Sequence, residues 1–230
     1  MNANHNAQAN PAPARPYDLL IFDWDGTLMD STSMIAACIQ DACVAVGEPR
    51  PPTELAKHVI GLGLRDALEM CAPSCPPEKY PELARHYSQN FLQQDAHLKL
   101  FDGVIDMLDR FKTQGYTLAV ATGKSRKGLD RVLQQSQLGA YFAATRTADE
   151  TASKPSPVMV LELLSELSVP AHRALVIGDT THDILMAQNA GVPAAAVTFG
   201  AQSHDKLIGY NPIQIFNQFN DLSAWLLNHA

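Results

Sequence analysis

The sequence predicts an α/β fold in which a parallel β-sheet is covered by helices on both faces. Three observations lead to this prediction. Short apolar runs typical of buried strands alternate with longer segments that have helical periodicity. The strand-like runs end in polar residues, at the edge where ligands bind to such sheets. The segment 53–91 has helical patterns and no strand-like run, so we expect a helical insertion there.

The size and composition fit this organisation. A chain of 230 residues can form one large domain, or one domain with a smaller insert. Hydrophobic residues make up 46% of the chain and charged residues 18%, which is ordinary for a globular protein with a substantial core.

The first half of the chain is expected to contain one strand followed by helices. In the segment 32–46 apolar residues recur at helical spacing, Asp30-Ser31 can cap the helix, and Gly47 ends it. The expected elements are a strand over 17–22, the helix over 32–46, and helical segments over 53–91 with breaks at 61–63 and 71–77.

The second half alternates between helix and strand, which implies a doubly wound, Rossmann-like core. We expect helices over 104–114, 126–135 and 157–167, and one that opens at 178–183 and runs to 190. A helical segment should follow after 197 and extend up to 209, and a last helix should begin after 221. The expected strands cover 117–121, 141–144, 174–177 and 194–197. This division predicts a core domain of 17–30 and 100–230, a helical cap of 31–99, and a disordered tail of 1–16.

Charge and targeting signals exclude several classes of function. The formal net charge is −7 without a basic block, which argues against nucleic-acid binding. The start of the chain resembles neither a signal peptide nor a membrane span, so we expect a cytoplasmic protein with no membrane partner. The four cysteines have no spacing typical of a zinc site and are interpreted as free thiols. Whether the chain is a monomer or a homodimer stays open.

The stretch 19–28 carries the first chemical signal. An apolar run ends in Asp23, Trp24, Asp25, Gly26 and Thr27. Side chains alternate along an extended chain, so the two carboxylates should project to the same side. They are costly there unless a cation lies between them, and Mg²⁺ prefers such oxygen ligands. The exposed N–H groups of the turn, with the Thr27 hydroxyl, are suited to an anion. The alternative is a strand that ends in an Asp-rich turn.

Three further polar clusters fall at expected strand ends or helix starts: Thr122 with Gly123, then Lys154, then Asp179 with Asp183. Each has an ordinary alternative. Thr122 could begin a helix, Lys154 could be a surface lysine, and the two acids could be a helix cap and a first-turn acid. The joint pattern at one edge of the sheet favours a site.

Together these residues resemble the four motifs of the haloacid dehalogenase (HAD) superfamily. The motifs are Asp23-Trp24-Asp25-Gly26-Thr27, Thr122, Lys154-Pro155, and 178–183. Their order and spacing match the helical-cap subfamily IA, which includes phosphoglycolate phosphatases and beta-phosphoglucomutases. The resemblance runs from about Tyr17 to the end of the chain.

The resemblance implies a role for each matched residue. Asp23 is similar to the nucleophile that forms an aspartyl-phosphate, and Asp25 to the general acid/base. Thr122 and Lys154 resemble the groups that hold the transferring phosphoryl. We expect Gly123 to take part in substrate binding, as the Thr27 turn does.

The resemblance also implies a metal centre. Asp179 is similar to a direct Mg²⁺ ligand beside Asp23 and the main-chain carbonyl of Asp25, while Asp183 would act through water or orient Lys154. Mg²⁺ and Lys154 would then offset the repulsion between an anionic nucleophile and a phosphate. Mn²⁺ stays open as the metal used in the cell.

The expected cap contains a glycine-bearing segment, 58–65, that resembles the specificity loop of the phosphoglycolate phosphatase group. Arg65 could bind a carboxylate or a second phosphate of the substrate. The alternative is an ion pair with Glu69 one helical turn away. A role of His58 in binding is also open but is the less favoured interpretation, and a Schiff-base role for Lys57 ranks low.

The leading hypothesis is a Mg²⁺-dependent phosphatase of a small phosphorylated metabolite, with phosphoglycolate as the best single substrate. A phosphomutase and a non-catalytic phosphate-binding module are the alternatives. The second acid, Asp25, argues against carbon–halogen cleavage. A P-loop is excluded because Leu118 occupies the position of its first glycine.

Overall fold

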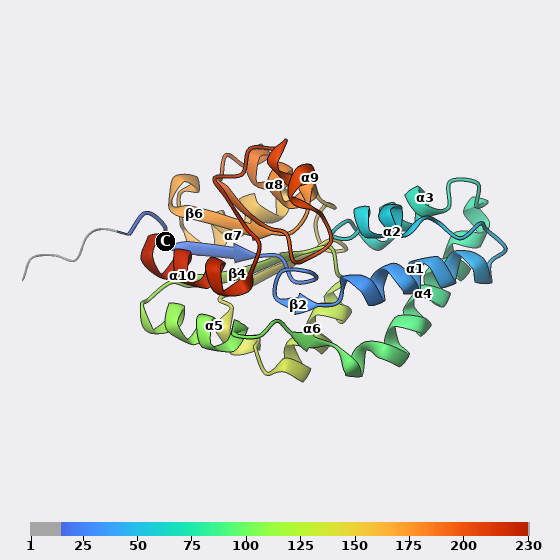
Figure 1. Ribbon diagram of the computed structural model, residues 1–230, viewed down its shortest axis with the longest axis horizontal. Coiled ribbons are helices and arrows are strands. Elements are labelled where there is room, and N and C mark those ends of the chain that lie inside the picture. Colours follow the sequence, from blue (N-terminus) through green and yellow to red (C-terminus); the bar gives the residue numbers. More distant parts are fainter. Residues whose placement is uncertain (1–14, 230) are drawn as a thin grey trace, which may run out of the picture.

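The computed structural model describes residues 15–229 and shows an α/β core beside a helical block (Figure 1). The six-stranded sheet of the core has the order β5-β4-β1-β6-β7-β8, and all its strand pairs are parallel. The strands are β1 Leu19–Phe22, β4 Thr117–Thr122, β5 Ala144–Thr147, β6 Ala174–Gly178, β7 Ala194–Val197 and β8 Gln214–Phe216. The predicted fold class is confirmed.

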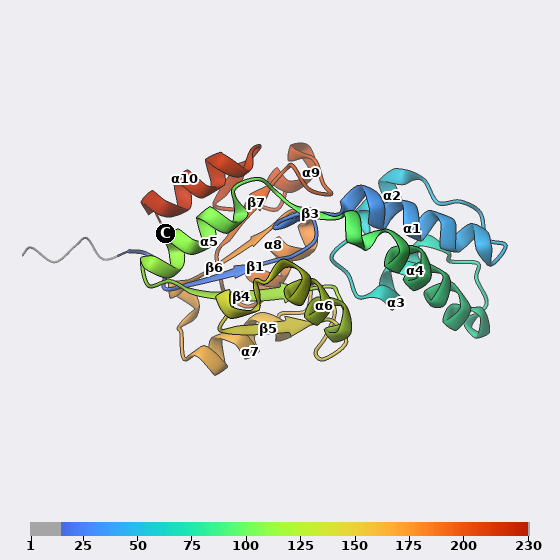
Figure 2. The ribbon, with the colours of Figure 1, turned by 90° about the horizontal axis from the view of Figure 1, so that it is seen from below.

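Helices cover both faces of the sheet (Figure 2). Leu20 and Phe22 of β1 point into an apolar core beneath three helices, α5 Val104–Thr113, α6 Arg126–Ser136 and α10 Phe219–His229. Leu19 and Ile21 point to the opposite face and pack with α7 Val158–Leu167, α8 Thr181–Asn189 and α9 His204–Ile208. All four side chains are fully buried, which explains why this strand reads as a continuous apolar run.

The helical block has an apolar core of its own, formed by α1 Thr32–Ala45, α2 Thr53–His58, α3 Leu64–Cys71 and α4 Tyr80–Gln94. The four cysteines lie in this block as buried free thiols. Where the chain enters and leaves the block, two short strands pair antiparallel, β2 Met29–Asp30 and β3 Lys99–Leu100. The division into a core of 17–30 and 100–230 and a cap of 31–99 stays a prediction, and this pairing lies at its proposed boundary.

Two expected elements differ from the structure, and one strand of the six-stranded sheet was not expected. The strand expected over 141–144 begins three residues later, because 139–141 form a 3₁₀ turn and β5 aligns with β4 from Ala144 onward. The segment after 197 was expected to be helical up to 209, but only α9, His204–Ile208, forms a helix there. The unexpected strand is the short edge strand β8.

Residues 1–14 of the expected disordered tail lie outside the described residues. Arg15, near the end of that segment, donates hydrogen bonds to the carbonyls of Gln114 and Gly115. Arg173 donates to the carbonyls of Arg15 and Pro16, so these two residues lie against the core.

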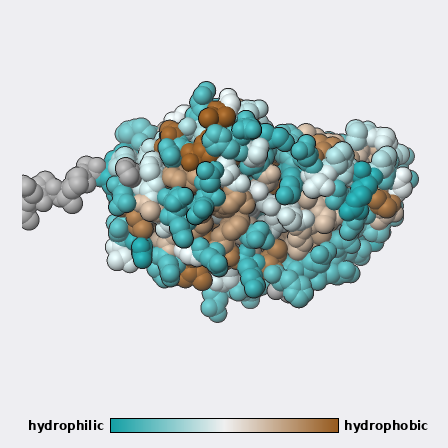
Figure 3. All heavy atoms as spheres, in the orientation of Figure 1, coloured by the Kyte–Doolittle hydropathy of each residue, from teal (hydrophilic) through white to brown (hydrophobic). Residues whose placement is uncertain are grey.

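Hydrophilic residues cover most of the face seen in Figure 3, as is usual for a globular domain. Among the helices of residues 15–229, none is both long enough and apolar enough to cross a bilayer.

Candidate active site

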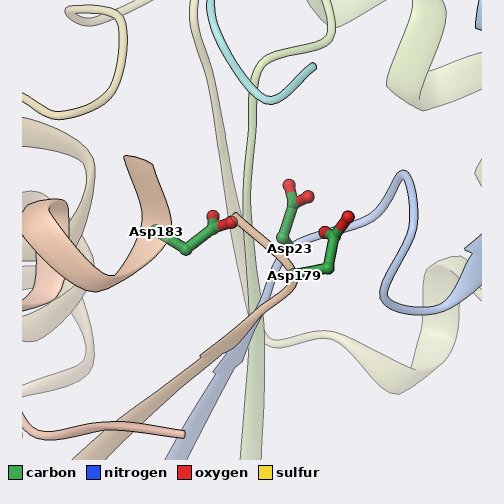
Figure 4. Close-up of side chains that lie close together, drawn as sticks. All are labelled: Asp23, Asp179 and Asp183. Atoms are coloured by element: carbon green, nitrogen blue, oxygen red, sulfur yellow. The ribbon is translucent and has the colours of Figure 1, made fainter. Parts of the chain in front are cut away.

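Three carboxylates meet at the carboxyl ends of β1 and β6, at the edge of the sheet nearest the helical block (Figure 4). Asp23 follows β1, Asp179 follows β6, and Asp183 lies in the first turn of α8. The amide of Asp23 donates to the carbonyl of Ile177 at 2.9 Å, which continues the β1–β6 pairing and sets Asp23 beside Asp179. One carboxylate oxygen from each of the three acids lies within 4.8 Å of the other two.

Lys154 lies between two of these acids. Its Nζ is 2.7 Å from Asp23 Oδ1 and 2.6 Å from Asp183 Oδ1, and the residue is 1% exposed. Burial lowers the pKa of Lys154, but the charges of Asp183 and Asp23 outweigh that effect and raise it, so the ammonium stays charged. A solvated surface lysine is thereby excluded.

Asp179 is held by the turn that follows Asp23 and by a loop after β7. Its Oδ1 accepts from the Thr27 hydroxyl at 3.0 Å, and its Oδ2 accepts from the amide of Ala201 at 2.7 Å. Gly26 and Gly200 allow this approach, because a Cβ at either position would overlap Asp179 Oδ2. Thr27 is fully buried and positions Asp179, so the structure does not place its side chain against a substrate.

Asp183 combines two roles. Its Oδ2 accepts from the amide and the hydroxyl of Thr180 at 3.1 and 2.7 Å, which completes a capping box at the start of α8. Its other oxygen binds Lys154. The cap residue is Thr180, so the alternative of Asp179 as the helix cap does not hold.

Lys154 supplies a single positive charge for three buried carboxylates. Burial, followed by the charges of Asp23 and Asp183, raises the pKa of Asp179 well above its usual value. Burial also raises the pKa of Asp23, to about 7, although Lys154 opposes the shift. Asp23 Oδ2 is buried without a hydrogen-bond partner among the described residues. Such an oxygen, beside two more carboxylates and one lysine, fits a divalent cation.

Asp25 lies apart from the three acids. Its Oδ1 accepts from the Ser31 hydroxyl at 2.7 Å, and its Oδ2 is 2.9 Å from Lys124 Nζ. Lys124 also lies over the ring of Phe91, 4.7 Å from its centroid. Both oxygens of the Asp25 side chain are therefore held, by Ser31 and by Lys124, and the residue lines the cavity described next.

A cavity of about 400 Å³ opens between the core and the helical block. Its lining includes Asp23, Asp25, Thr122 and Gly123 from the core. A Cβ on Gly123 would lie 2.5 Å from the carbonyl oxygens of Gly61 and Leu62, so the loop of the helical block approaches this turn closely. The cavity thus brings the strand-end residues together with the segment expected to select the substrate.

The structure does not bring Arg65 to the cavity. Its side chain is 83% exposed, and its Nε donates to Glu69 Oε1 at 2.8 Å. This is the alternative that the helical spacing offered, because residues four apart lie on one face of α3.

His58 contacts the core instead of the cavity. Its carbonyl lies 2.8 Å from His182 Nε2, and the two imidazole rings contact each other at a tilt of 52°, with centroids 5.2 Å apart. Gly63 donates its amide to the Ser153 hydroxyl at 2.8 Å, next to Lys154. These contacts fix the loop of the helical block over the site.

Lys124 was missed as a site residue. Thr122 and Gly123 are predicted as site residues from the motif pattern, whereas Lys124 enters only the excluded P-loop pattern. Its place immediately after a buried strand was a usable signal for a charge at the site.

Comparison with known proteins agrees with this geometry. Residues 20–197 match the model of the haloacid dehalogenase-like hydrolase family. A protein of Dickeya dadantii named probable phosphatase IndB is 36% identical over 89% of this chain and 91% of its own. A phosphoglycolate phosphatase of Aliivibrio fischeri is 32% identical over 90% of this chain and 96% of its own.

A solved structure has the same fold. The predicted phosphoglycolate phosphatase of Haemophilus somnus superimposes with a TM-score of 0.80 at 25% identity, over 90% of this chain and 96% of that chain. The expectation of a phosphatase-type hydrolase is confirmed. The chain belongs to the haloacid dehalogenase-like hydrolase family.

Proposed function

We propose that the protein is a Mg²⁺-dependent phosphatase that hydrolyses a small phosphorylated metabolite through an aspartyl-phosphate on Asp23. The observation that carries the proposal is the state of the Asp23 carboxylate. One oxygen is fixed by Lys154, the other has no hydrogen-bond partner among the described residues, and the residue lines the cavity. A nucleophile needs this combination of fixed orientation and a free lone pair.

The first step forms a bond between an Asp23 oxygen and phosphorus and breaks the bond between phosphorus and the ester oxygen. Asp25, on the same cavity, gives its proton to the departing oxygen, so the product leaves as an alcohol. In the second step Asp25 takes a proton from water, whose oxygen attacks phosphorus and returns Asp23 as a carboxylate. Ser31 donates to one oxygen of Asp25, and the ammonium of Lys124 lies beside the other, where it favours the carboxylate that remains once Asp25 has given up its proton.

Lys154 is suited to stabilise the transferred group, since its ammonium already lies 2.7 Å from Asp23. Thr122 is buried at the end of β4, and its hydroxyl accepts from the amide of Lys124 at 3.2 Å. Its own proton therefore remains available for a phosphoryl oxygen, with the amide of Gly123 beside it.

The residues that would hold Mg²⁺ are Asp23, Asp179 and Asp183, together with the main-chain carbonyl of Asp25. When bound, the ion would supply positive charge between the Asp23 carboxylate and the phosphate, which otherwise repel each other. Carboxylate oxygens of the three acids that lie within 4.8 Å of one another support this assignment.

The test is phosphate release from a panel of phosphorylated metabolites, with Mg²⁺ or EDTA. Phosphoglycolate comes first, because relatives carry its name. We expect release that requires the metal, that disappears in Asp23→Asn, and that persists in Asp102→Asn, an exposed control. Undiminished release by Asp23→Asn would refute the assignment of the nucleophile, and isomerisation of a sugar phosphate without net release would indicate a mutase.

A further inference from the structure

The cavity has two chemically different ends. The core contributes Asp23, Asp25 and Thr122, which belong to the reaction. The helical block contributes large apolar and aromatic side chains from three helices: Ile35 and Ile39 of α1, Leu64 of α3, and Tyr87, Phe91 and Leu92 of α4. Everything attached to the ester oxygen must lie against this second end, because the phosphoryl group occupies the first.

The basic residues of the lining are already engaged or lie outside. Lys124 pairs with Asp25, and Arg131 pairs with the buried carboxylate of Asp95. The third basic residue of the lining, Lys127, is exposed. A negatively charged leaving group would therefore meet mainly apolar side chains, while Lys124 and Arg131 already have acidic partners. Burying a charge without a partner is costly, so the cavity disfavours such a group.

The volume points in the same direction. A cavity of about 400 Å³ lies within the range of sites that enclose drug-sized ligands. A two-carbon acid such as glycolate would leave much of this space, including the wall made by Phe91 and Leu64, without contact. A leaving group with an apolar ring would occupy more of this space, and the lining offers it apolar side chains such as Phe91 and Leu64.

Building on the proposed phosphatase function, we propose that the substrate is a phosphate monoester whose leaving group is uncharged and carries a ring or a similarly bulky apolar body. After the proton transfer from Asp25 this group departs as a neutral alcohol. The apolar wall then binds the part of the substrate that does not react, and so it determines specificity.

The test compares three monoesters in the wild-type protein with Mg²⁺: 2-phenylethyl phosphate, ethyl phosphate and phosphoglycolate. The first two share an unactivated primary alcohol as leaving group and differ by the ring. We expect kcat/KM for 2-phenylethyl phosphate to exceed both others by about tenfold or more, a difference of about 1.4 kcal/mol in transition-state binding.

Substitutions of Phe91, an aromatic residue of the cavity lining, test whether the apolar side chains cause the preference for the phenylethyl ester. Phe91→Ala should reduce the preference for the phenylethyl over the ethyl ester, and Phe91→Leu, which keeps an apolar side chain, should reduce it less. Met70→Ala is the control, since Met70 is exposed on α3 and does not line the cavity. The ratio of kcat/KM for the phenylethyl ester to kcat/KM for the ethyl ester is informative even if a variant lowers the activity on both.

Two outcomes would overturn the inference, and a third would remove its basis. A kcat/KM for phosphoglycolate equal to or above that of the phenylethyl ester would refute the uncharged leaving group while leaving the phosphatase intact. An unchanged preference in both Phe91 variants would refute the role of the wall. Absence of turnover of every ester, including the metabolite panel, would instead refute the proposed function.

Discussion

Replacing Lys154 by methionine removes the one ammonium that lies between Asp23 and Asp183. Methionine has a similar length and no charge, so the two carboxylates would remain buried with their ion pairs broken. Removing one partner of a buried ion pair typically costs about 3–5 kcal/mol. For a chain of this size each kcal/mol lowers the melting temperature by about 2–4 °C, so we expect a decrease of roughly 6–20 °C in EDTA.

The assay is thermal unfolding, followed by circular dichroism, in EDTA and again in Mg²⁺. The decrease should be smaller in Mg²⁺, because a cation bound to the same acids replaces part of the missing charge. Lys206→Met is the matched control, since Lys206 is exposed and surface substitutions usually change stability by less than about 0.5 kcal/mol. If Lys154→Met were no less stable than this control, the account of the buried charges would be wrong.

Three further predictions concern two glycines that allow close approaches and one partly exposed ion pair. In Gly200→Ala the new Cβ would displace Asp179, so Mg²⁺-dependent phosphate release should fall by about 100-fold or more, whereas Gly139→Ala, which meets no atom within 4 Å, should leave it unchanged. In Gly123→Ala the Cβ would push away the loop of the helical block, and limited proteolysis should then cut that block faster than in the wild type. Hydrogen bonds and charge from Arg173 lower the pKa of Asp18, so Asp18→Asn should unfold more readily at pH 7, by at most about 1 kcal/mol because the pair is partly exposed. Since the pKa of Asp18 is lower in the folded than in the unfolded protein, this difference should be lost as the pH falls through the folded pKa; a difference in urea unfolding that persists at still lower pH would contradict the assignment.

The core strands could be predicted because a strand that is buried on both faces consists of a short continuous run of apolar residues, which is visible in the local sequence. Ala194–Val197 was predicted with its observed bounds, as a run of small apolar residues buried on both faces. β5 and β8 carry polar residues and lie at the two edges of the sheet, where burial is incomplete. Their bounds depend on pairing with the neighbouring strand, which a local pattern does not contain.

The convergence of the charged motif residues could also be predicted, because parallel strands end at one edge of the sheet. These residues are Asp23, Lys154, Asp179 and Asp183. Their partners could not be predicted. Lys154 and Asp23 are 131 positions apart, and nothing local indicates that one ammonium would serve two acids. Lys124 was missed for the same reason, since its contacts with Asp25 and Phe91 come from two distant segments. The roles of these residues in catalysis stay predictions.

The most direct test of the central claim is to trap the covalent intermediate. The protein would be mixed with Mg²⁺ and its best monoester, quenched in acid within milliseconds, and digested for mass spectrometry. We predict a phosphoryl group on the peptide that contains Asp23, which should be absent in Asp23→Asn. A phosphoryl group on another residue, or rapid phosphate release with Asp23 never modified, would contradict the account.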